Sequence, residues 1–218
     1  MLTQAEENYI KVIYGIEMVT STNVSTTKIA EKLKTSAASV TDMIQKLAQK
    51  NLVNYRKYKG ASLSKKGKEA ALAIVRKHRL WEVFLMNKLQ YSWDEVHELA
   101  EQLEHIQSDS LVDKLAAYLD HPTHDPHGEP IPDKKGNITH HPDVTLSSVQ
   151  VNNRCIVIGI KDSSAVFLKF LDTLNICIGR ELKVLSRAPF DKSMSIQNGQ
   201  TAISISQQIS TNLFVKNI

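Results

Sequence analysis

Residues 24–53, VSTTKIAEKLKTSAASVTDMIQKLAQKNLV, decide the fold of the first part of this 218-residue chain. Apolar residues recur three and four positions apart over about Thr27–Leu33 and again over about Ala37–Asn51, which predicts two amphipathic helices. Lys34–Ser36 leaves room only for a tight turn, and Ser36 is a suitable N-cap for the second helix. Two short helices joined by such a turn are typical of a helix-turn-helix motif.

The residues on either side complete a winged helix-turn-helix domain. An apolar stripe predicts a helix over residues 4–18, ahead of the motif. Behind it, Val53–Arg56 is predicted to be a strand, and a basic turn with Gly60, a second short strand and a helix after Lys65 follow. A two-stranded hairpin directly behind the second helix of the motif is a wing.

The charge of this module points to a nucleic-acid partner. Between Lys28 and Lys68 the chain carries 11 lysines and arginines against two acids, a local net charge of +9. The other residues carry 16 basic and 21 acidic side chains, a net charge of −5. A basic module on a mildly acidic body indicates a polyanion partner for that module, and we predict double-stranded DNA. The alternative is a helix pair with a hairpin that makes no DNA contact.

The composition of the whole chain, with 42% hydrophobic and 23% charged residues, is that of an ordinary soluble protein. No apolar run approaches the roughly 20 residues of a membrane span. The first residues carry early acids in a helical period, unlike a secretory signal. Cys155 and Cys177 lie in apolar company, which suits reduced core thiols, so we expect a cytoplasmic protein.

The rest of the chain is predicted to have a helical, an irregular and a β-rich region in turn. A long helical region is predicted from about Lys66 to Tyr118, with a break near Leu89–Ser92, and the proline- and histidine-rich residues 119–143 should be irregular. From residue 144 onward, short β-runs predict a small barrel-like domain with one helix, Ser163–Leu174, inserted. The runs are SSVQV, RCIVIGI, ELKVLS and TAISIS, with a hairpin turn at Asn198-Gly199.

The helix after the wing is unusually apolar. Between residues 80 and 89 it carries Leu80, Trp81, Val83, Phe84, Leu85 and Leu89. Such a face predicts a surface that pairs with a second copy of the chain. The alternative is burial against the winged module within one chain.

Residues 96–105, VHELAEQLEH, carry the second feature with chemical meaning. On a helix that turns by about 100° per residue, His97, Glu101, Glu104 and His105 fall within an arc of about 100°. This arc is either the solvated face of an amphipathic helix or half of a metal site.

Six motifs in this order resemble the diphtheria toxin repressor and manganese transport regulator family of metal-dependent bacterial repressors. They are EENYIKVIY (6–14), SAASVTDMIQKL (36–47), YRKYKGASLSKKGKEAA (55–71), RKHRLWE (76–82), VHELAEQLEH (96–105) and HDPHGEPIP (124–132). The resemblance implies a mainly α protein with a small β part. Its domains would be a winged helix-turn-helix domain (1–72), a helical metal-binding and dimerisation domain (73–140) and an SH3-like domain (141–218).

The resemblance implies a primary site for Mn(II) or Fe(II) formed by Asn8, Glu101, Glu104 and His105. Their oxygen and nitrogen donors suit either ion. Glu101 stands where iron-responsive relatives have a cysteine, which favours manganese, whereas Asn8 replaces the aspartate of manganese-type relatives, which favours iron. Lys11 stands where regulators with paired metals have a glutamate, which implies that the paired site is absent.

A secondary metal site is also implied, between the helical and the C-terminal parts of longer relatives. Its matching residues are His78, Glu82, Asp125, His127 and Asp162, with His97 as a further candidate. His78 and Glu82 are four residues apart, so both can face one ion if they lie on a helix. The alternative for each residue is a solvated or supporting role.

The DNA contacts are expected at the second helix of the motif and at the wing. Small side chains at the start of that helix, Ser36, Ala37, Ser39 and Thr41, are the expected readers of base edges. The expected phosphate contacts are Lys46, Arg56, Lys57 and Lys59.

The predicted function is that of a homodimeric transcriptional repressor of metal-homeostasis genes, with the metal as corepressor and no enzymatic activity. The first alternative is a winged-helix regulator that senses an organic ligand. The second is a metal-dependent hydrolase, against which the chain has no H-E-x-x-H pairing.

Overall fold

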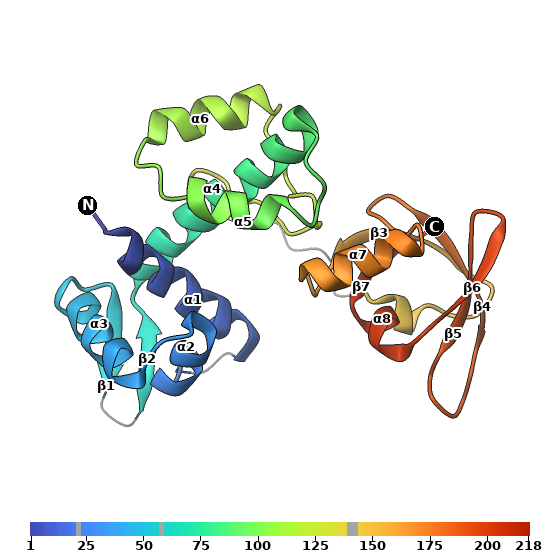
Figure 1. The fold of residues 1–218 in the computed structure, drawn as a ribbon, viewed down its shortest axis with the longest axis horizontal. Coiled ribbons are helices and arrows are strands. Elements are labelled where there is room, and N and C mark those ends of the chain that lie inside the picture. Colours follow the sequence, from blue (N-terminus) through green and yellow to red (C-terminus); the bar gives the residue numbers. More distant parts are fainter. Residues whose placement is uncertain (21–22, 57–58, 139–143) are drawn as a thin grey trace. The chain divides into compact units, whose positions relative to one another are not determined.

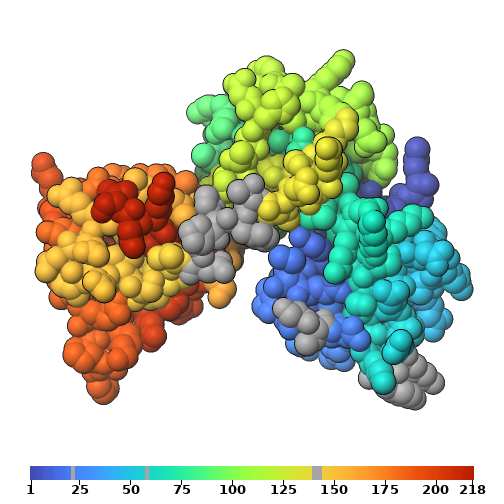
Figure 2. Space-filling model, turned by 180° about the vertical axis from the view of Figure 1, so that it is seen from behind, coloured from blue at the N-terminus to red at the C-terminus, as the bar shows by residue number. Residues whose placement is uncertain are grey.

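The computed structural model describes residues 1–20, 23–56, 59–138 and 144–218 (Figure 1). The chain forms two compact units, and Figure 2 draws it as a space-filling surface. The first unit consists of Met1–His78, Glu101–Asp109 and Pro132–Asn137, and the second of Arg79–Ala100, Ser110–Ile131 and Ile138–Ile218. Within the described ranges, no helix has the length and apolar character that crossing a membrane requires.

The first unit contains the predicted winged helix-turn-helix. Its helices are α1 (Gln4–Thr20), α2 (Thr26–Leu33) and α3 (Ala37–Gln49), followed by strands β1 (Val53–Arg56) and β2 (Gly60–Leu63) and by the start of α4 (Lys65–Leu89). Ser36 is the N-cap of α3, as predicted, because its side chain accepts a hydrogen bond from the Ser39 N–H. Lys34 ends α2 in the left-handed region, with φ of 51°, and this conformation makes the tight turn.

One apolar core joins α1 to the motif and the wing. Its fully buried members include Ile10 and Ile13 of α1, Ile29 of α2, Val40, Ile44 and Leu47 of α3, and Ala61 of the wing. The wing is antiparallel, with Val53 opposite Leu63 and Arg56 opposite Gly60. Because α1 packs in the same close-packed core as α3, a displacement of α1 requires α3 to move or repack.

The helical part of the second unit packs α4 against α6 (Asp109–Tyr118). Leu80 and Val83 of α4 lie in one cluster with Val112 and Leu115 of α6. The prediction that the whole apolar stretch is a dimer surface is therefore wrong for Leu80, Val83 and Leu85, which are buried within one chain. Leu80 and Val83 pack against α6 within the second unit. Trp81 and Phe84 are half-buried, and Leu89 is exposed.

The C-terminal part of the second unit is a five-stranded antiparallel sheet in the order β6-β5-β4-β3-β7. The strands are β3 (Arg154–Ile160), β4 (Glu181–Arg187), β5 (Met194–Asn198), β6 (Thr201–Ile205) and β7 (Leu213–Asn217). The inserted helix is confirmed as α7 (Ala165–Thr173), and a short α8 (Gln207–Thr211) precedes β7. The predicted hairpin is confirmed too, since Asn198 pairs with Thr201 across a turn that contains Gly199.

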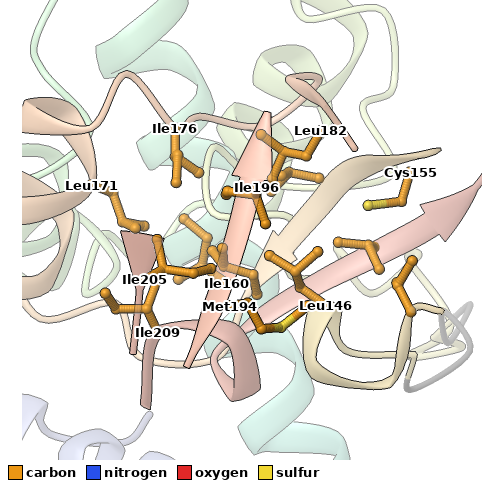
Figure 3. Packing of buried hydrophobic residues seen from close by; sticks show 14 of the residues in the cluster. Leu146, Cys155, Ile160, Leu171, Ile176, Leu182, Met194, Ile196, Ile205 and Ile209 are labelled. Atoms are coloured by element: carbon orange, nitrogen blue, oxygen red, sulfur yellow. The ribbon is translucent and has the colours of Figure 1, made fainter. Parts of the chain in front are cut away.

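Two predictions for this part are wrong. SSVQV is no strand: it begins in a 3₁₀ turn (Leu146–Ser148) that places Leu146 and Val149 in the core. The prediction that both cysteines are core thiols is wrong for Cys177, which is exposed. Cys155 is buried in the core, and burial raises the pKa of its thiol to about 11. Figure 3 shows Leu146, Cys155 and Met194 in this cluster, together with Ile160, Ile196 and Ile205 of the strands.

Candidate metal centres and nucleic-acid interface

The predicted metal-binding helix ends earlier than the pattern of residues 96–105 predicts. Helix α5 ends at Leu103, so Glu104 and His105 lie in the turn that follows it. The prediction that His97, Glu101, Glu104 and His105 share one helical arc is therefore wrong for the last two. Ending the helix at Leu103 lets Glu104 point into the first unit, where it is only 1% exposed.

Glu104 is held by two basic groups from distant parts of the chain. Its Oε2 lies 2.5 Å from the Lys11 ammonium of α1 and 2.6 Å from His78 Nδ1 of α4. Burial raises the pKa of the Glu104 carboxyl, but the hydrogen bond from His78 and the charge of Lys11 outweigh burial and hold that pKa below its ordinary value. Glu104 is therefore held as an anion by these two partners.

His105 is oriented by Glu7, a residue that the sequence did not single out. His105 Nδ1 donates to Glu7 Oε2 at 2.6 Å, and Gln107 Nε2 donates to Glu7 Oε1 at 2.6 Å. The other ring nitrogen, Nε2, lies 3.9 Å from Glu104 Oε1. A carboxylate that fixes one nitrogen of an imidazole while the other faces an anionic ligand is the usual support of a metal-binding histidine. Glu7 and Lys11 are four residues apart on α1, so both side chains can face the turn that carries Glu104 and His105.

The two other predicted primary ligands, Asn8 and Glu101, stay predictions. Asn8 is half-buried on α1 and makes no side-chain hydrogen bond in the part of the chain that is described. Glu101 is exposed near the end of α5, outside the close groups of acidic and histidine ligand atoms in the described ranges. Glu104 Oε1 and His105 Nε2 approach each other to 3.9 Å, and the full ligand set stays a prediction.

A second group, in the second unit, gathers Glu82, Asp125 and His127. One ligand atom from each lies within 4.8 Å of the others, and all three residues are buried. His127 Nε2 contacts the Trp93 carbonyl at 2.9 Å, which leaves Nδ1 facing Glu82 Oε2 at 3.7 Å. His97 Nδ1 lies 3.2 Å from Glu82 Oε1. His78 precedes Glu82 by one turn of α4.

The electrostatics of this second group favour a cation. Burial, together with the charges of Glu82 and Glu129, outweighs the charge of Arg79, whose Nε lies 3.5 Å from Asp125 Oδ2, and raises the pKa of Asp125 to about 7. For His127, burial lowers the pKa, but the hydrogen bond and charge of Glu82 and the charge of Asp125 outweigh it, so the pKa is raised. Two buried carboxylates beside an imidazole match the hard oxygen and nitrogen donors that Mn(II) and Fe(II) take. The three residues therefore fit a divalent ion.

The loop that carries Asp125 and His127 lies against strand β3. Asp125 Oδ1 accepts the backbone N–H groups of His127 and Glu129, at 2.8 and 2.9 Å, and so fixes the turn. The His127 carbonyl accepts the Ile160 N–H at 2.9 Å. Asp162, two residues further on, accepts the Ser164 N–H and is outside the close group, so its role as a ligand stays a prediction.

The predicted base-reading side chains lie at the N-terminal end of α3. Ser36, Ala37 and Ser39 are exposed, and the Ser36 and Ser39 hydroxyls are 2.9 Å apart. Thr41 is half-buried, and its hydroxyl donates to the Ala37 carbonyl. Among the predicted phosphate contacts, Lys46, Arg56 and Lys59 are exposed, whereas Lys57 lies outside the described residues.

Comparison with known proteins finds a match for each of the three parts of the chain. Residues 1–61 match the N-terminal DNA binding domain of the iron dependent repressor, residues 64–133 its metal binding and dimerisation domain, and residues 144–217 the FeoA domain. An HTH-type transcriptional regulator of Methanocaldococcus jannaschii is 32% identical over 119 residues, which are 55% of this chain and 95% of that protein. The chain belongs to the iron-dependent repressor family.

Other members of the repressor family show the same likeness. The iron-dependent repressor IdeR of Mycobacterium tuberculosis is 33% identical over 131 residues, which are 60% of this chain and 56% of that protein. A solved structure of a manganese-dependent transcriptional repressor in complex with manganese is 33% identical, with a TM-score of 0.85 over 98% of this chain and all of that one. The predicted architecture, including the SH3-like C-terminal domain, is thereby confirmed.

Gly128 determines how close the ligand-bearing loop of this repressor comes to β3. Its φ is +82°, and a Cβ there would lie 2.2 Å from the Ile158 carbonyl oxygen and 2.4 Å from Gly159 Cα. We expect Gly128→Ala to lower the free energy of unfolding by at least about 2 kcal/mol in urea, because backbone must move. Gly179→Ala is the matched control, with a φ of +83° but nothing within 4 Å. Equal losses in the two variants would contradict this account.

The second group should bind metal more tightly as pH rises. Because burial and the neighbouring carboxylates raise the pKa of Asp125 to about 7, this group holds a proton below neutral pH, and the proton must leave when a cation binds. The raised pKa of Asp125 also affects the metal-free fold. Between the ordinary pKa of an aspartate and about 7, the folded chain holds a proton that the unfolded chain has lost, so the free energy of unfolding should fall as pH rises through this range. Mn(II) titration of a Glu104→Ala variant should give about tenfold higher affinity at pH 7 than at pH 6. A flat profile would contradict the prediction.

Proposed function

We propose that the chain is a homodimeric, metal-dependent repressor that binds double-stranded operator DNA in the cytoplasm and controls genes of metal-ion homeostasis, with Mn(II) or Fe(II) as corepressor. One observation carries the proposal: Glu104 and His105 contact helix α1 of the winged helix-turn-helix through Lys11 and Glu7. A change of charge at this turn therefore acts directly on the DNA-binding module.

The residues of α1 provide the route from the metal group to DNA. Glu7 and Lys11 contact the turn, and Ile10 and Ile13 of the same helix lie in the core that carries α3. Glu104 and His105 would ligate a divalent ion, with Asn8 and Glu101 as the further ligands proposed for it. Since Glu7 holds His105, fixing the imidazole also fixes α1 against the turn.

The donor set supports manganese or iron without a choice between them. Carboxylate and imidazole ligands suit both ions, and the relatives named above include one iron-dependent and one manganese-dependent repressor. We propose the second group as an auxiliary site built from Glu82, Asp125 and His127. His78, His97 and Asp162 remain its proposed additional ligands.

Two copies are required to read a palindromic operator, whose half-sites lie about 34 Å apart or a multiple of that distance. The exposed or half-buried apolar residues of the helical part, Trp81, Phe84, Leu89, Leu111 and Tyr118, support a dimer surface there. On each copy, the exposed start of α3 would enter the major groove, with Ser36, Ala37, Ser39 and Thr41 near the bases. Lys46, Arg56, Lys57 and Lys59 would hold phosphates, which makes binding salt-dependent.

In vitro selection of DNA tests the proposal. The full chain is mixed with random double-stranded DNA in Mn(II), in Fe(II) under anaerobic conditions, and in EDTA. We expect an inverted repeat to be enriched in the presence of metal and lost in EDTA. Equal enrichment in EDTA would overturn metal dependence, and no enrichment in any arm would overturn the DNA-binding function itself.

A further inference from the structure

The Lys11 ammonium contacts Glu104, one of the proposed primary metal ligands. It is 2.5 Å from Glu104 Oε2 and 3.1 Å from His78 Nδ1, and it reaches both from helix α1. Glu104 is 1% exposed, so its charge depends on these partners for compensation. Removing one partner of a buried ion pair is costly because the other charge is left uncompensated. Lys11 therefore has a role in the metal-free protein.

The two oxygens of Glu104 are divided between two kinds of partner. Oε2 faces Lys11 and His78, whereas Oε1 faces His105 Nε2 at 3.9 Å. A divalent ion held by Glu104 and His105 would share the Glu104 carboxylate with the Lys11 ammonium. Both cations would then share one anionic group, and each would weaken the attraction of the other.

We propose that Lys11 is an internal cation that joins helix α1 to the metal-binding turn before metal binds, and that lowers the affinity of the site by competing for the charge of Glu104. This inference rests on the proposed function, since it assumes that Glu104 and His105 bind a divalent ion. It assigns to Lys11 a share in setting the metal concentration at which the protein responds.

A thermodynamic cycle fixes the sign of both effects. In the metal-free state the ammonium compensates a buried carboxylate, so its removal destabilises that state. In the metal-bound state the ion already compensates Glu104, so the removal of the ammonium costs less. The difference between the two costs must appear as tighter metal binding in the variant that lacks the ammonium.

The test compares Lys11→Met with Lys50→Met in the full chain. Lys50 is the matched control, because its ammonium lies 2.6 Å from the buried Glu6 carboxylate but outside the metal group. Thermal unfolding is measured in EDTA and in excess Mn(II), and Mn(II) affinity is measured by calorimetry. We expect Lys11→Met to lower the metal-free melting temperature by about 5–10 °C and to bind Mn(II) about tenfold more tightly than wild type.

Each outcome decides a separate claim. An unchanged metal-free melting temperature of Lys11→Met, or unchanged or weaker Mn(II) binding, would overturn the role of Lys11. A loss of stability without a gain in Mn(II) affinity would make the lysine a structural ion pair only and would also overturn the proposal. If wild type itself showed no Mn(II)-induced rise in melting temperature, the proposed function would fail whatever the variant does.

Discussion

Glu104→Ala is expected to abolish the metal response of DNA binding, so that operator affinity in excess Mn(II) falls by about 10- to 100-fold to the level seen in EDTA. Glu104 is the buried anion that faces His105 Nε2 and also pairs with Lys11 of α1. Its loss removes a ligand and the link from the turn to the winged module together. The measurement is fluorescence anisotropy of a labelled operator, with metal and with chelator.

Glu98→Ala is the control for this variant, because Glu98 lies on the exposed side of α5, one turn before the end of the helix. It should keep the wild-type response. The metal model is wrong if Glu104→Ala binds operator as tightly as wild type both under chelation and in excess Mn(II). Circular dichroism of the variants checks that the helices are retained.

Glu7→Gln is expected to weaken Mn(II) binding by about 10- to 100-fold, the usual effect of removing a carboxylate that orients a metal-binding histidine. The amide keeps the size of the side chain but loses the charge that holds His105 Nδ1 at 2.6 Å. The affinity is measured by calorimetry in the metal-free protein.

Glu6→Gln is a control from the same helix, because Glu6 is equally buried but pairs with Lys50, away from the turn. It should leave Mn(II) affinity close to wild type. Equal affinities for the two variants would mean that Glu7 does not support the site. Asn8→Ala in the same series tests the predicted amide ligand, whose removal should also weaken binding.

Much of the fold could be predicted because it depends on short-range patterns. The helix-turn-helix and wing follow from apolar spacing, from the Ser36 cap and from the turn at Gly60, all of which act within a few residues. The burial of Leu80 and Val83 could not be predicted in the same way. Whether an apolar helix face meets a second chain or α6 depends on tertiary packing, which the sequence of α4 alone does not encode.

The candidate site, too, could be predicted only where it depends on patterns that are local in the sequence or on the family resemblance. The pattern of α5 continues beyond Leu103, but Glu104 leaves the helix for partners on other elements, including Lys11, 93 residues away in sequence. Glu7 was missed for the same reason, because its partner His105 is 98 residues away. Glu82, Asp125 and His127 were predicted from the family resemblance, and the structure brings them together.

The most direct test of the account is the coupling between metal and operator. Operator affinity of the full chain is measured in Mn(II) and in EDTA, and Mn(II) affinity is measured with and without operator. The account predicts that Mn(II) tightens operator binding by about 10- to 100-fold and that operator tightens Mn(II) binding by the same factor, because linkage is reciprocal. Operator binding of equal strength in Mn(II) and in EDTA would contradict it.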